Sequence, residues 1–343
     1  MDNNKLVLHA VAGSGKTQRI IDSLSREKEI AIITYTITNQ EELRQRIIKH
    51  FNGEIPDNIH LFGVWQFLYN FCLVPLLPRN PKGIIFDGEI LKKYVRRWDT
   101  YFTDNGYALS NKISKFLLDN AQQYPYISRI DEFFEEVYID EIQDFTGYDL
   151  NLLCSLAQSK AKILCVGDFW QHTFGTSYAG NVNSGVISRF PDFKKKFENS
   201  GFLFDETSLQ KSIRCTIETC DFVRENLGIN IFTKNEKHGK VQFIQEEEKI
   251  CEILNDPSIK KLFYKNHSTY DCQNSGNWGD SKGQTVENVC VVLNPTTFRL
   301  YKANKLSELA MGTTAKFYVA CTRSLGDIYF IEQTKVNIKG NKE

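Results

Sequence analysis

The chain carries, near its start, a glycine-rich segment whose residue types suit the binding of phosphate. Gly13 and Gly15 let the backbone turn so that several N–H groups face one point. Lys16 supplies a cation for phosphate oxygens, and Thr17 supplies a hydroxyl for Mg²⁺. The alternative is a strand-to-helix turn that is rich in glycine by chance. We expect a nucleoside triphosphate to be bound by Ala12, Gly13, Ser14, Gly15, Lys16 and Thr17.

Two adjacent carboxylates, Asp140 and Glu141, follow a short apolar run. Asp140 suits Mg²⁺, whereas Glu141 suits the orientation and deprotonation of an attacking water. The alternative is an acidic helix start, where both residues are also favourable. We prefer the catalytic interpretation because the same chain has the glycine-rich segment. Gln171 ends a later apolar run, and we expect it to contact a γ-phosphate there.

A mostly parallel sheet would bring these side chains to one edge of the sheet. The sequence has the alternation of strand-like and helix-like stretches that such a sheet requires. Short apolar runs are separated by stretches with helical spacing, such as Glu41–Phe51. This alternation predicts an α/β fold. We expect four strands around the candidate site. The first begins at Lys5, and the others cover residues 29–35, 137–144 and 161–166.

The organisation of the chain predicts two sheet domains and one insertion. Residues 68–132 change character, because Pro75, Pro78 and Pro81 break the chain and charged helical stretches follow, so we expect a helical insertion there. We expect the first domain to comprise residues 1–67 and 133–200, and the second residues 201–343. In the second domain we expect a helix at 217–227, a loop at 271–283, and strands at 240–244, 259–264, 289–293 and 327–331.

Composition narrows the function classes. The 343 residues carry 42 basic and 42 acidic side chains, so any nucleic-acid surface must be a local basic groove. The nine cysteines form no CxxC pair, which argues against a zinc site and indicates reduced thiols. The start has no signal-peptide pattern, and no run approaches the ~20 apolar residues of a membrane span. We therefore expect a cytoplasmic protein without a membrane partner.

Taken together and in this order, the motifs resemble those of the superfamily 1 helicases of the UvrD/Rep type. Motif I of that family is similar to the Ala-x-Ala-Gly-Ser-Gly-Lys-Thr sequence here, and motif II is similar to Asp-Glu-Ile-Gln-Asp. The matching segments are 10–17 (motif I), 34–36 with Asn39 (Ia), 64–67 (Ib), 140–144 (II), 167–171 (III), Arg214 (IV), 281–285 (V) and 318–323 (VI).

This resemblance implies two RecA-like P-loop NTPase domains with parallel sheets, and ATP with Mg²⁺ in a cleft between them. It implies an ATP-dependent translocase or helicase on single-stranded DNA, moving 3′→5′, with arginines that stabilise the transferring phosphoryl group. It assigns Mg²⁺ to Thr17 and Asp140. The catalytic residues that it implies are Lys16, Glu141, Gln171, Arg214 and Arg323.

The resemblance also implies residues that contact the strand by stacking or through its backbone. For each aromatic among them the alternative is an ordinary place in the core. These residues are Thr36, Asn39, Trp65, Phe67, Phe174 (with Tyr178 nearby) and Thr285.

Two other functions stay open. Only a short interval separates Arg214 from Ser281, too little for the second accessory domain of UvrD-like enzymes. This favours an ATPase subunit that senses DNA or RNA and works with a partner such as a nuclease in anti-phage defence, without processive unwinding. The zero net charge also allows a nucleotide-gated signalling module that never touches nucleic acid. Ile213 stands where the family has an aromatic, so we expect phosphate to be recognised better than adenine.

Overall fold

The computed structural model describes residues 4–97, 99–173, 175 and 180–339. Its contacts divide the chain into two compact units, which are described separately. The N-terminal unit holds residues 1–9, 16–169 and 174–208, and the C-terminal unit holds residues 10–15, 170–173 and 209–343. Residues 10–15 of the glycine-rich segment are therefore grouped with the C-terminal unit, whereas Lys16 and Thr17 are grouped with the N-terminal unit.

The N-terminal unit is built on a six-stranded sheet whose strand order is β3-β2-β6-β7-β1-β8. The pairs β2–β3, β2–β6, β6–β7 and β1–β7 are parallel. Because β7 lies between β1 and β6, the carboxyl ends of these three strands are neighbours. The strands are β1 (Lys5–Ala10), β2 (Ile30–Thr34), β3 (Ile59–Gly63), β6 (Glu136–Ile139), β7 (Lys162–Gly167) and β8 (Leu203–Leu209).

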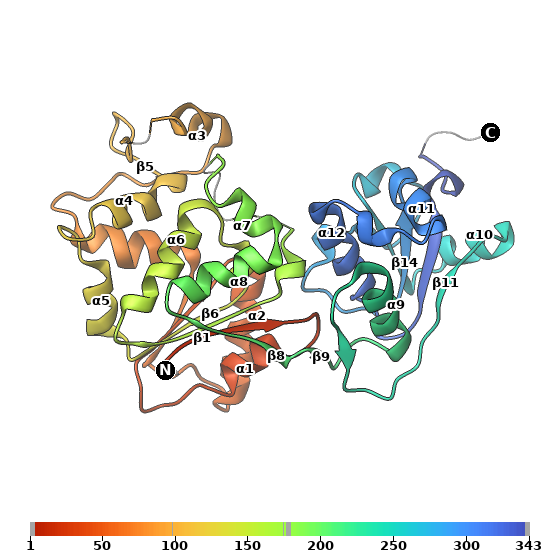
Figure 1. The fold of residues 1–343 in the computed structure, drawn as a ribbon, viewed down its shortest axis with the longest axis horizontal. Coiled ribbons are helices and arrows are strands. Elements are labelled where there is room, and N and C mark those ends of the chain that lie inside the picture. Colours follow the sequence, from red (N-terminus) through yellow and green to blue (C-terminus); the bar gives the residue numbers. More distant parts are fainter. Residues whose placement is uncertain (1–3, 98, 174, 176–179, 340–343) are drawn as a thin grey trace. The chain divides into compact units, whose positions relative to one another are not determined.

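Helices follow these strands and complete the unit (Figure 1). The α2 helix begins after Thr36, whose hydroxyl accepts a hydrogen bond from the Asn39 amide at 3.1 Å. The α8 helix buries Phe193 and Phe197, which recur at helical spacing. The helices are α1 (Lys16–Ile21), α2 (Ile37–His50), α6 (Gly147–Ser155), α7 (Ser184–Ser188) and α8 (Phe190–Asn199).

The insertion between β3 and β6 is mainly helical. It starts with a π-helical stretch, Gln66–Leu73, and carries a small parallel sheet of two short strands. Figure 1 shows this part of the unit, with α3 and β5, at the end away from α1. Its elements are β4 (Ile84–Ile85), α3 (Gly88–Tyr94), β5 (Ala108–Leu109), α4 (Ile113–Asp119) and α5 (Tyr126–Phe133).

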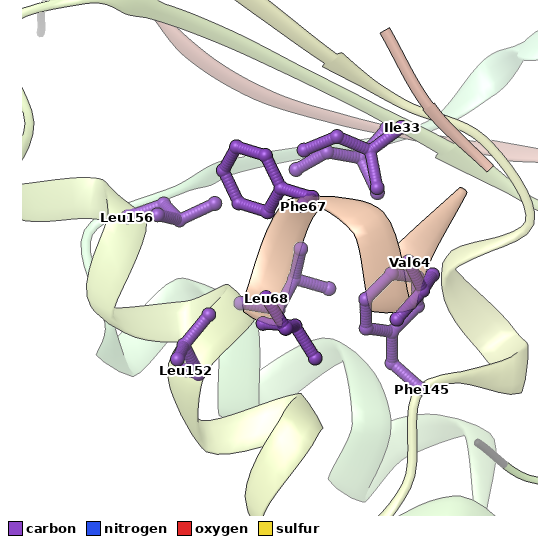
Figure 2. A pocket seen from close by; sticks show the side chains of 9 residues that line it. Ile33, Val64, Phe67, Leu68, Phe145, Leu152 and Leu156 are labelled. Carbon is purple, nitrogen blue, oxygen red and sulfur yellow. The ribbon is translucent and has the colours of Figure 1, made fainter. Parts of the chain in front are cut away.

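A cavity of about 10 Å³ lies under the sheet, and its walls are apolar (Figure 2). Its lining includes Ile33 of β2, Phe67 of the π-helical stretch and Leu152 of α6. A space of this size and lining offers a water no hydrogen-bond partner, so we expect it to be dry. The cavity therefore belongs to the packing of the core.

The C-terminal unit is built on a five-stranded parallel sheet with the order β11-β15-β14-β12-β13. The α9 helix matches the predicted range and is capped at its carboxyl end by Gly228, which has φ +69°. The strands are β11 (Val241–Phe243), β12 (Ile259–Phe263), β13 (Ser275–Asn277), β14 (Asn288–Leu293) and β15 (Ile328–Glu332). The helices are α9 (Ile217–Leu227), α10 (Glu247–Asn255), α11 (Pro295–Lys302) and α12 (Met311–Cys321).

The predicted α/β fold with parallel sheets is confirmed, and two details differ. The predicted domain boundary after residue 200 falls too early, because β8 joins the first sheet and the N-terminal unit extends to Ser208. The segment 271–283, expected as a loop, contains β13. Over the described ranges, no helix is both long and apolar enough to cross a membrane.

Candidate nucleotide and nucleic-acid site

The glycine-rich segment connects the end of β1 with the start of α1 at Lys16. Gly13 has φ +70° and Gly15 has φ +91°, a backbone region that favours glycine. A Cβ atom on Gly13 would lie 2.7 Å from both the Arg214 Cβ and the Ser212 Oγ. Position 13 therefore needs glycine for its conformation and also for the close approach of residues 212–214.

Backbone hydrogen bonds hold the first half of this loop. The Val11 amide donates to the Leu209 carbonyl at 3.0 Å, and the Ile213 amide donates to the Gly13 carbonyl at 2.8 Å. The Ala12 amide donates to the Tyr318 hydroxyl at 2.8 Å. In this structure the Ala12 N–H therefore has a partner within the protein, although we predicted it as a phosphate donor.

The second half of the loop offers donors to an anion. Within the described part of the chain, the amides of Gly13, Gly15, Lys16 and Thr17 have no protein acceptor. The Ser14 hydroxyl is buried and also lacks a partner there. A turn of unpaired N–H groups with a buried orphan hydroxyl fits an anionic phosphate chain.

The two predicted carboxylates lie directly after β6, beside the start of α1. The Thr17 hydroxyl donates to Asp140 Oδ2 at 3.4 Å, and the Glu141 amide donates to Asp140 Oδ1 at 2.9 Å. Oxygen atoms of this kind suit Mg²⁺, which takes few protein ligands and completes its shell with water and phosphate. The described residues contain no cluster of three or more His, Cys, Asp or Glu side chains suited to a metal.

Glu141 faces Lys16, and its backbone is unusual. Glu141 Oε2 lies 3.8 Å from Lys16 Nζ, and the two side chains are only 13 % and 11 % exposed. Glu141 has φ +56° and ψ +45°, the left-handed region that costs an ordinary residue roughly 1–2 kcal/mol. The fold therefore holds this carboxylate in place at some energetic cost.

Gln143 connects the carboxylates to the end of β7. Its amide nitrogen donates to Glu141, and its amide oxygen accepts from the Asp168 backbone N–H at 3.0 Å. A Cβ on Gly167 would lie 2.5 Å from that amide oxygen, so the two strand ends approach at a glycine. Sequence reasoning treated Gln143 only as part of a motif, and its bridging role comes from the structure.

Two further residues lie at the ends of these strands. Gln171, in a 3₁₀ turn after β7, is buried, and its contact with a γ-phosphate stays a prediction. His9 in β1 is buried against Phe190 and Phe204. Burial and, second, the nearby Lys16 ammonium lower the pKa of His9 to about 3, so this ring is neutral near pH 7.

Both predicted arginines lie in the C-terminal unit. Arg214 is half-buried, and its Nη1 donates to the Thr322 carbonyl at 3.3 Å. Arg323 is 2 % exposed, with Nε bonded to the Val319 carbonyl at 2.9 Å and Nη1 to the Gln284 carbonyl at 3.3 Å. Arg323 thus links the end of α12 to the segment before β14. The catalytic roles of both arginines stay predictions.

Part of the predicted nucleic-acid surface lies at the carboxyl ends of β2 and β3, where Thr34 pairs with Gly63. Thr36 and Asn39 form the start of α2. Trp65 is half-buried and meets Phe86 of the insertion edge to face, with ring centroids 5.2 Å apart. Phe86 is 54 % exposed, and no sequence pattern indicated this pair, because the contact depends on how the insertion folds.

The other predicted strand contacts have different outcomes. Phe67 is 2 % exposed and lines the apolar cavity, so it belongs to the core and does not suit base stacking (Figure 2). Thr285 is exposed before β14, and its role stays a prediction. Phe174 and Tyr178 lie outside the described residues.

The C-terminal unit has a groove that sequence reasoning missed. It measures about 610 Å³ and lies at the carboxyl ends of β12 and β14. Its lining includes Tyr264, Lys265 and Asn266 after β12, and Thr296 and Arg299 on α11. Neither Lys265 nor Arg299 makes an ion pair with any described residue. The connections along this sheet reverse direction between β12 and β14, the position where open parallel sheets commonly bind ligands.

Comparison with known proteins gives a likeness of fold. No protein-family model and no curated protein matches the sequence. The chain is similar to an arterivirus nonstructural protein 10, a helicase solved with DNA, with 13 % identity and a TM-score of 0.52 over 96 % of this chain and 61 % of that one. A further crystal structure of an arterivirus nonstructural protein 10 helicase gives 13 % identity and a TM-score of 0.50, covering 96 % and 60 %. The chain thus spans about three fifths of these helicases and shares a helicase fold with RecA-like domains.

Proposed function

We propose that this chain is a nucleic-acid-dependent ATPase of the superfamily 1 helicase type, which moves along single-stranded DNA in the 3′→5′ direction. One observation carries the proposal. Lys16 and Thr17, which directly follow the unpaired amides of the glycine-rich loop, lie beside the carboxylates of Asp140 and Glu141. The likeness of fold to solved helicases supports it.

The binding half of the site suits a triphosphate with Mg²⁺. The free amides of Gly13 and Gly15 would bind phosphate oxygens, and the Thr17 hydroxyl and Asp140 carboxylate would hold the metal. When bound, Mg²⁺ would neutralise charge on the phosphate oxygens. Lys16 would then exchange its pairing with Glu141 for the β- and γ-phosphates.

The reacting half of the site suits hydrolysis. Once Lys16 contacts phosphate, the Glu141 carboxylate is available to accept a proton from water. That water attacks the γ-phosphorus, the bond to the bridging β-phosphate oxygen breaks, and ADP and inorganic phosphate leave. Gln143 keeps Glu141 oriented through its bonds to Glu141 and to the Asp168 amide. We also assign Gln171 to sensing the γ-phosphate.

The arginines would stabilise charge on the transferring phosphoryl group, an effect worth about 10³–10⁵ in rate in other enzymes. Arg214 is the stronger candidate because its Cβ lies where the loop at Gly13 approaches it. Arg323 would contribute a second guanidinium while keeping the segment at Gln284 against α12.

We assign a nucleic-acid surface to each unit. On the N-terminal unit this surface comprises the start of α2 at Thr36 and Asn39, and the ring of Trp65. On the C-terminal unit, the Lys265 and Arg299 groove would bind backbone phosphates, and Thr285 would add a polar contact.

The deciding experiment measures ATP hydrolysis with and without single-stranded DNA or RNA, together with strand displacement on a tailed duplex. We expect stimulation by single strands and displacement in one direction. The absence of stimulation by any nucleic acid would refute the proposal and favour a nucleotide-gated module.

Two substitutions test the chemistry. We expect Lys16→Ala and Glu141→Gln to abolish hydrolysis, and Glu141→Gln to retain nucleotide binding, because only the proton acceptor is removed. Turnover at the wild-type rate in Glu141→Gln would show that another group is the base. Lys93→Ala, an exposed change on α3, is the control for expression and folding.

A second candidate function is favoured by the small size of the insertion, whose only described sheet consists of β4 and β5. In this alternative the chain is an ATPase subunit that senses nucleic acid beside a partner such as a nuclease. Stimulated hydrolysis without strand displacement would select it over the motor.

A further inference from the structure

The insertion contains a groove that the proposed function does not use. It measures about 560 Å³, within the range of small-ligand sites. Its lining includes the proline-rich segment that carries Arg79 and Lys82, and the turn at Asp104.

The floor of this groove is aromatic. Phe116 stacks on Tyr124 with ring centroids 5.3 Å apart and an angle of 29°. Phe102 meets Phe116 edge to face at 5.4 Å. Phe116 is buried, whereas Phe102 and Tyr124 are partly exposed, so each of the latter two has surface to offer a flat ligand. Aromatic surfaces of this kind accept any nucleobase, because every base has a π-face.

The rim of the groove is basic. Arg79 and Lys82 are exposed, and neither side chain makes a hydrogen bond or ion pair with a described residue. Asp104 is the acidic side chain among the lining residues, so the rim has a net positive charge. A base on the floor would place its phosphate near these two cations.

The groove is also connected with the predicted nucleic-acid surface. The short strand β4 joins Lys82 to Phe86, and Phe86 contacts Trp65 at the end of β3. Four residues of extended chain span about 13 Å, at ~3.3 Å per residue. A strand that passes Trp65 would therefore reach this groove without leaving the N-terminal unit.

We propose that the groove of the insertion binds one unpaired nucleotide of a single-stranded nucleic acid. Its base would lie against Phe102 and Tyr124, and its phosphate would contact Arg79 and Lys82. This inference rests on the proposed function and adds a second, base-stacking contact at the end of the unit away from α1 (Figure 1).

Photo-crosslinking tests the placement directly. A short oligothymidylate with one 5-iodouracil is irradiated with the full chain, and the attached peptide is identified by mass spectrometry. We expect attachment at Phe102, Phe116 or Tyr124. Attachment only outside the insertion would overturn the proposal.

Binding measurements test the two halves of the groove. We expect Tyr124→Leu to weaken oligothymidylate binding at least about fivefold, whereas Tyr107→Leu, an exposed tyrosine outside the lining, does not. We expect Arg79→Ala/Lys82→Ala to lower the slope of log K against log salt by about 0.7 for each phosphate that is no longer neutralised. Lys93→Ala/Arg96→Ala removes the same charge elsewhere on the insertion and is the matched control.

Variants that bind DNA like their controls overturn the proposal, as does a Tyr124-dependent interaction with a protein partner that leaves DNA binding unchanged. The proposed function fails separately, when single strands do not stimulate hydrolysis by the wild-type chain. Crosslinks in the groove would then still stand.

Discussion

At position 13 the protein has room for a hydrogen atom and nothing larger. The Gly13 backbone has a positive φ, and the Arg214 Cβ and Ser212 Oγ occupy the place where a side chain would begin. These two requirements are distinct, because a positive φ alone costs an alanine about 1–2 kcal/mol, whereas a steric clash forces the loop to move.

Alanine substitutions separate these requirements. We expect Gly13→Ala to lower the free energy of unfolding by about 2–5 kcal/mol, the sum of backbone strain and clash, and to abolish nucleotide binding. Gly228→Ala has nearly the same φ, +69°, with no atom within 4 Å of the added Cβ, so only about 1–2 kcal/mol is expected. Urea unfolding and nucleotide titration measure both effects. Equal losses in the two variants would contradict the clash.

His9 makes the stability of the fold sensitive to acid. Its pKa is about 3 in the folded chain, against 6.5 for an ordinary histidine, because of burial and then the Lys16 charge. As the pH falls below 6.5, His9 binds a proton in the unfolded chain but stays neutral in the folded chain. The free energy of unfolding therefore falls between pH 6.5 and 3, by up to about 1.4 kcal/mol per unit from this group.

The variant His9→Gln tests this dependence, because glutamine does not titrate. We expect the stability difference between wild type and variant to shift in favour of the variant as the pH is lowered from 7 to 5. Urea unfolding at several pH values measures it. A difference that is constant with pH would show that His9 has the same pKa in the folded and the unfolded chain.

At the level of elements, the approach of β7 to the turn after β6 positions the catalytic carboxylate. Gly167 allows this approach, because a Cβ there would lie 2.6 Å from Ile142 Cγ1 and 2.5 Å from the Gln143 amide oxygen. Gln143 in turn bonds Glu141 and the Asp168 amide. The geometry of Glu141 is therefore set by two strands together.

We expect Gly167→Ala to push Gln143 away, to cost about 1–3 kcal/mol of stability and to reduce ATP hydrolysis about tenfold or more. Nucleotide binding should change less, because the loop amides are untouched. Gly185→Ala in α7 meets no atom within 4 Å and is the control. Wild-type turnover in Gly167→Ala would mean that Gln143 does not orient the base.

The elements that the sequence predicted well are those with an apolar pattern of their own. The helix Ile217–Leu227 and the buried strands β2 and β14 form where their own apolar patterns predict them. In contrast, β8 reads Leu-Phe-Asp-Glu-Thr-Ser-Leu and β13 reads Ser-Gly-Asn, so neither has a continuous apolar face. Their assignment depends on pairing with other strands, β8 with β1 and β13 with β12, which a local pattern cannot show.

The residues of the candidate site likewise fall into those that a sequence pattern indicates and those that only the fold brings together. Lys16, Thr17, Asp140 and Glu141 follow a spacing that chemistry imposes, and the structure brings these four together. Contacts such as Trp65 with Phe86 depend on how the insertion folds, so no local pattern could indicate them. The apolar pattern around Phe67 is compatible with a position in the core or on the surface. The structure buries this side chain in the core.

For the whole molecule, bound nucleotide should act as a stabilising ligand. A ligand that binds only the folded chain adds about 2.7 kcal/mol at a concentration one hundred times its dissociation constant. Since the proposed metal contacts come from Thr17 and Asp140, that gain should depend on Mg²⁺. Because this stabilisation depends on binding alone, it can be measured in a variant that does not hydrolyse ATP.

We expect ATP with Mg²⁺ to raise the unfolding temperature of Glu141→Gln, and EDTA to remove most of that rise. Adding Asp140→Asn to this variant should reduce the Mg²⁺-dependent part, since one anionic metal ligand is removed. Differential scanning fluorimetry provides the measurement. The same increase with and without Mg²⁺ would argue against metal-assisted binding.

The left-handed backbone of Glu141 has a consequence for how this protein can change over time. Asparagine and glycine adopt that conformation more readily than glutamate, so replacing the carboxylate should make the folded state more stable while removing the proposed base. Selection for stability alone would therefore favour chains that have lost turnover. A relative with asparagine or glycine at this position would be expected to bind nucleotide without cleaving it.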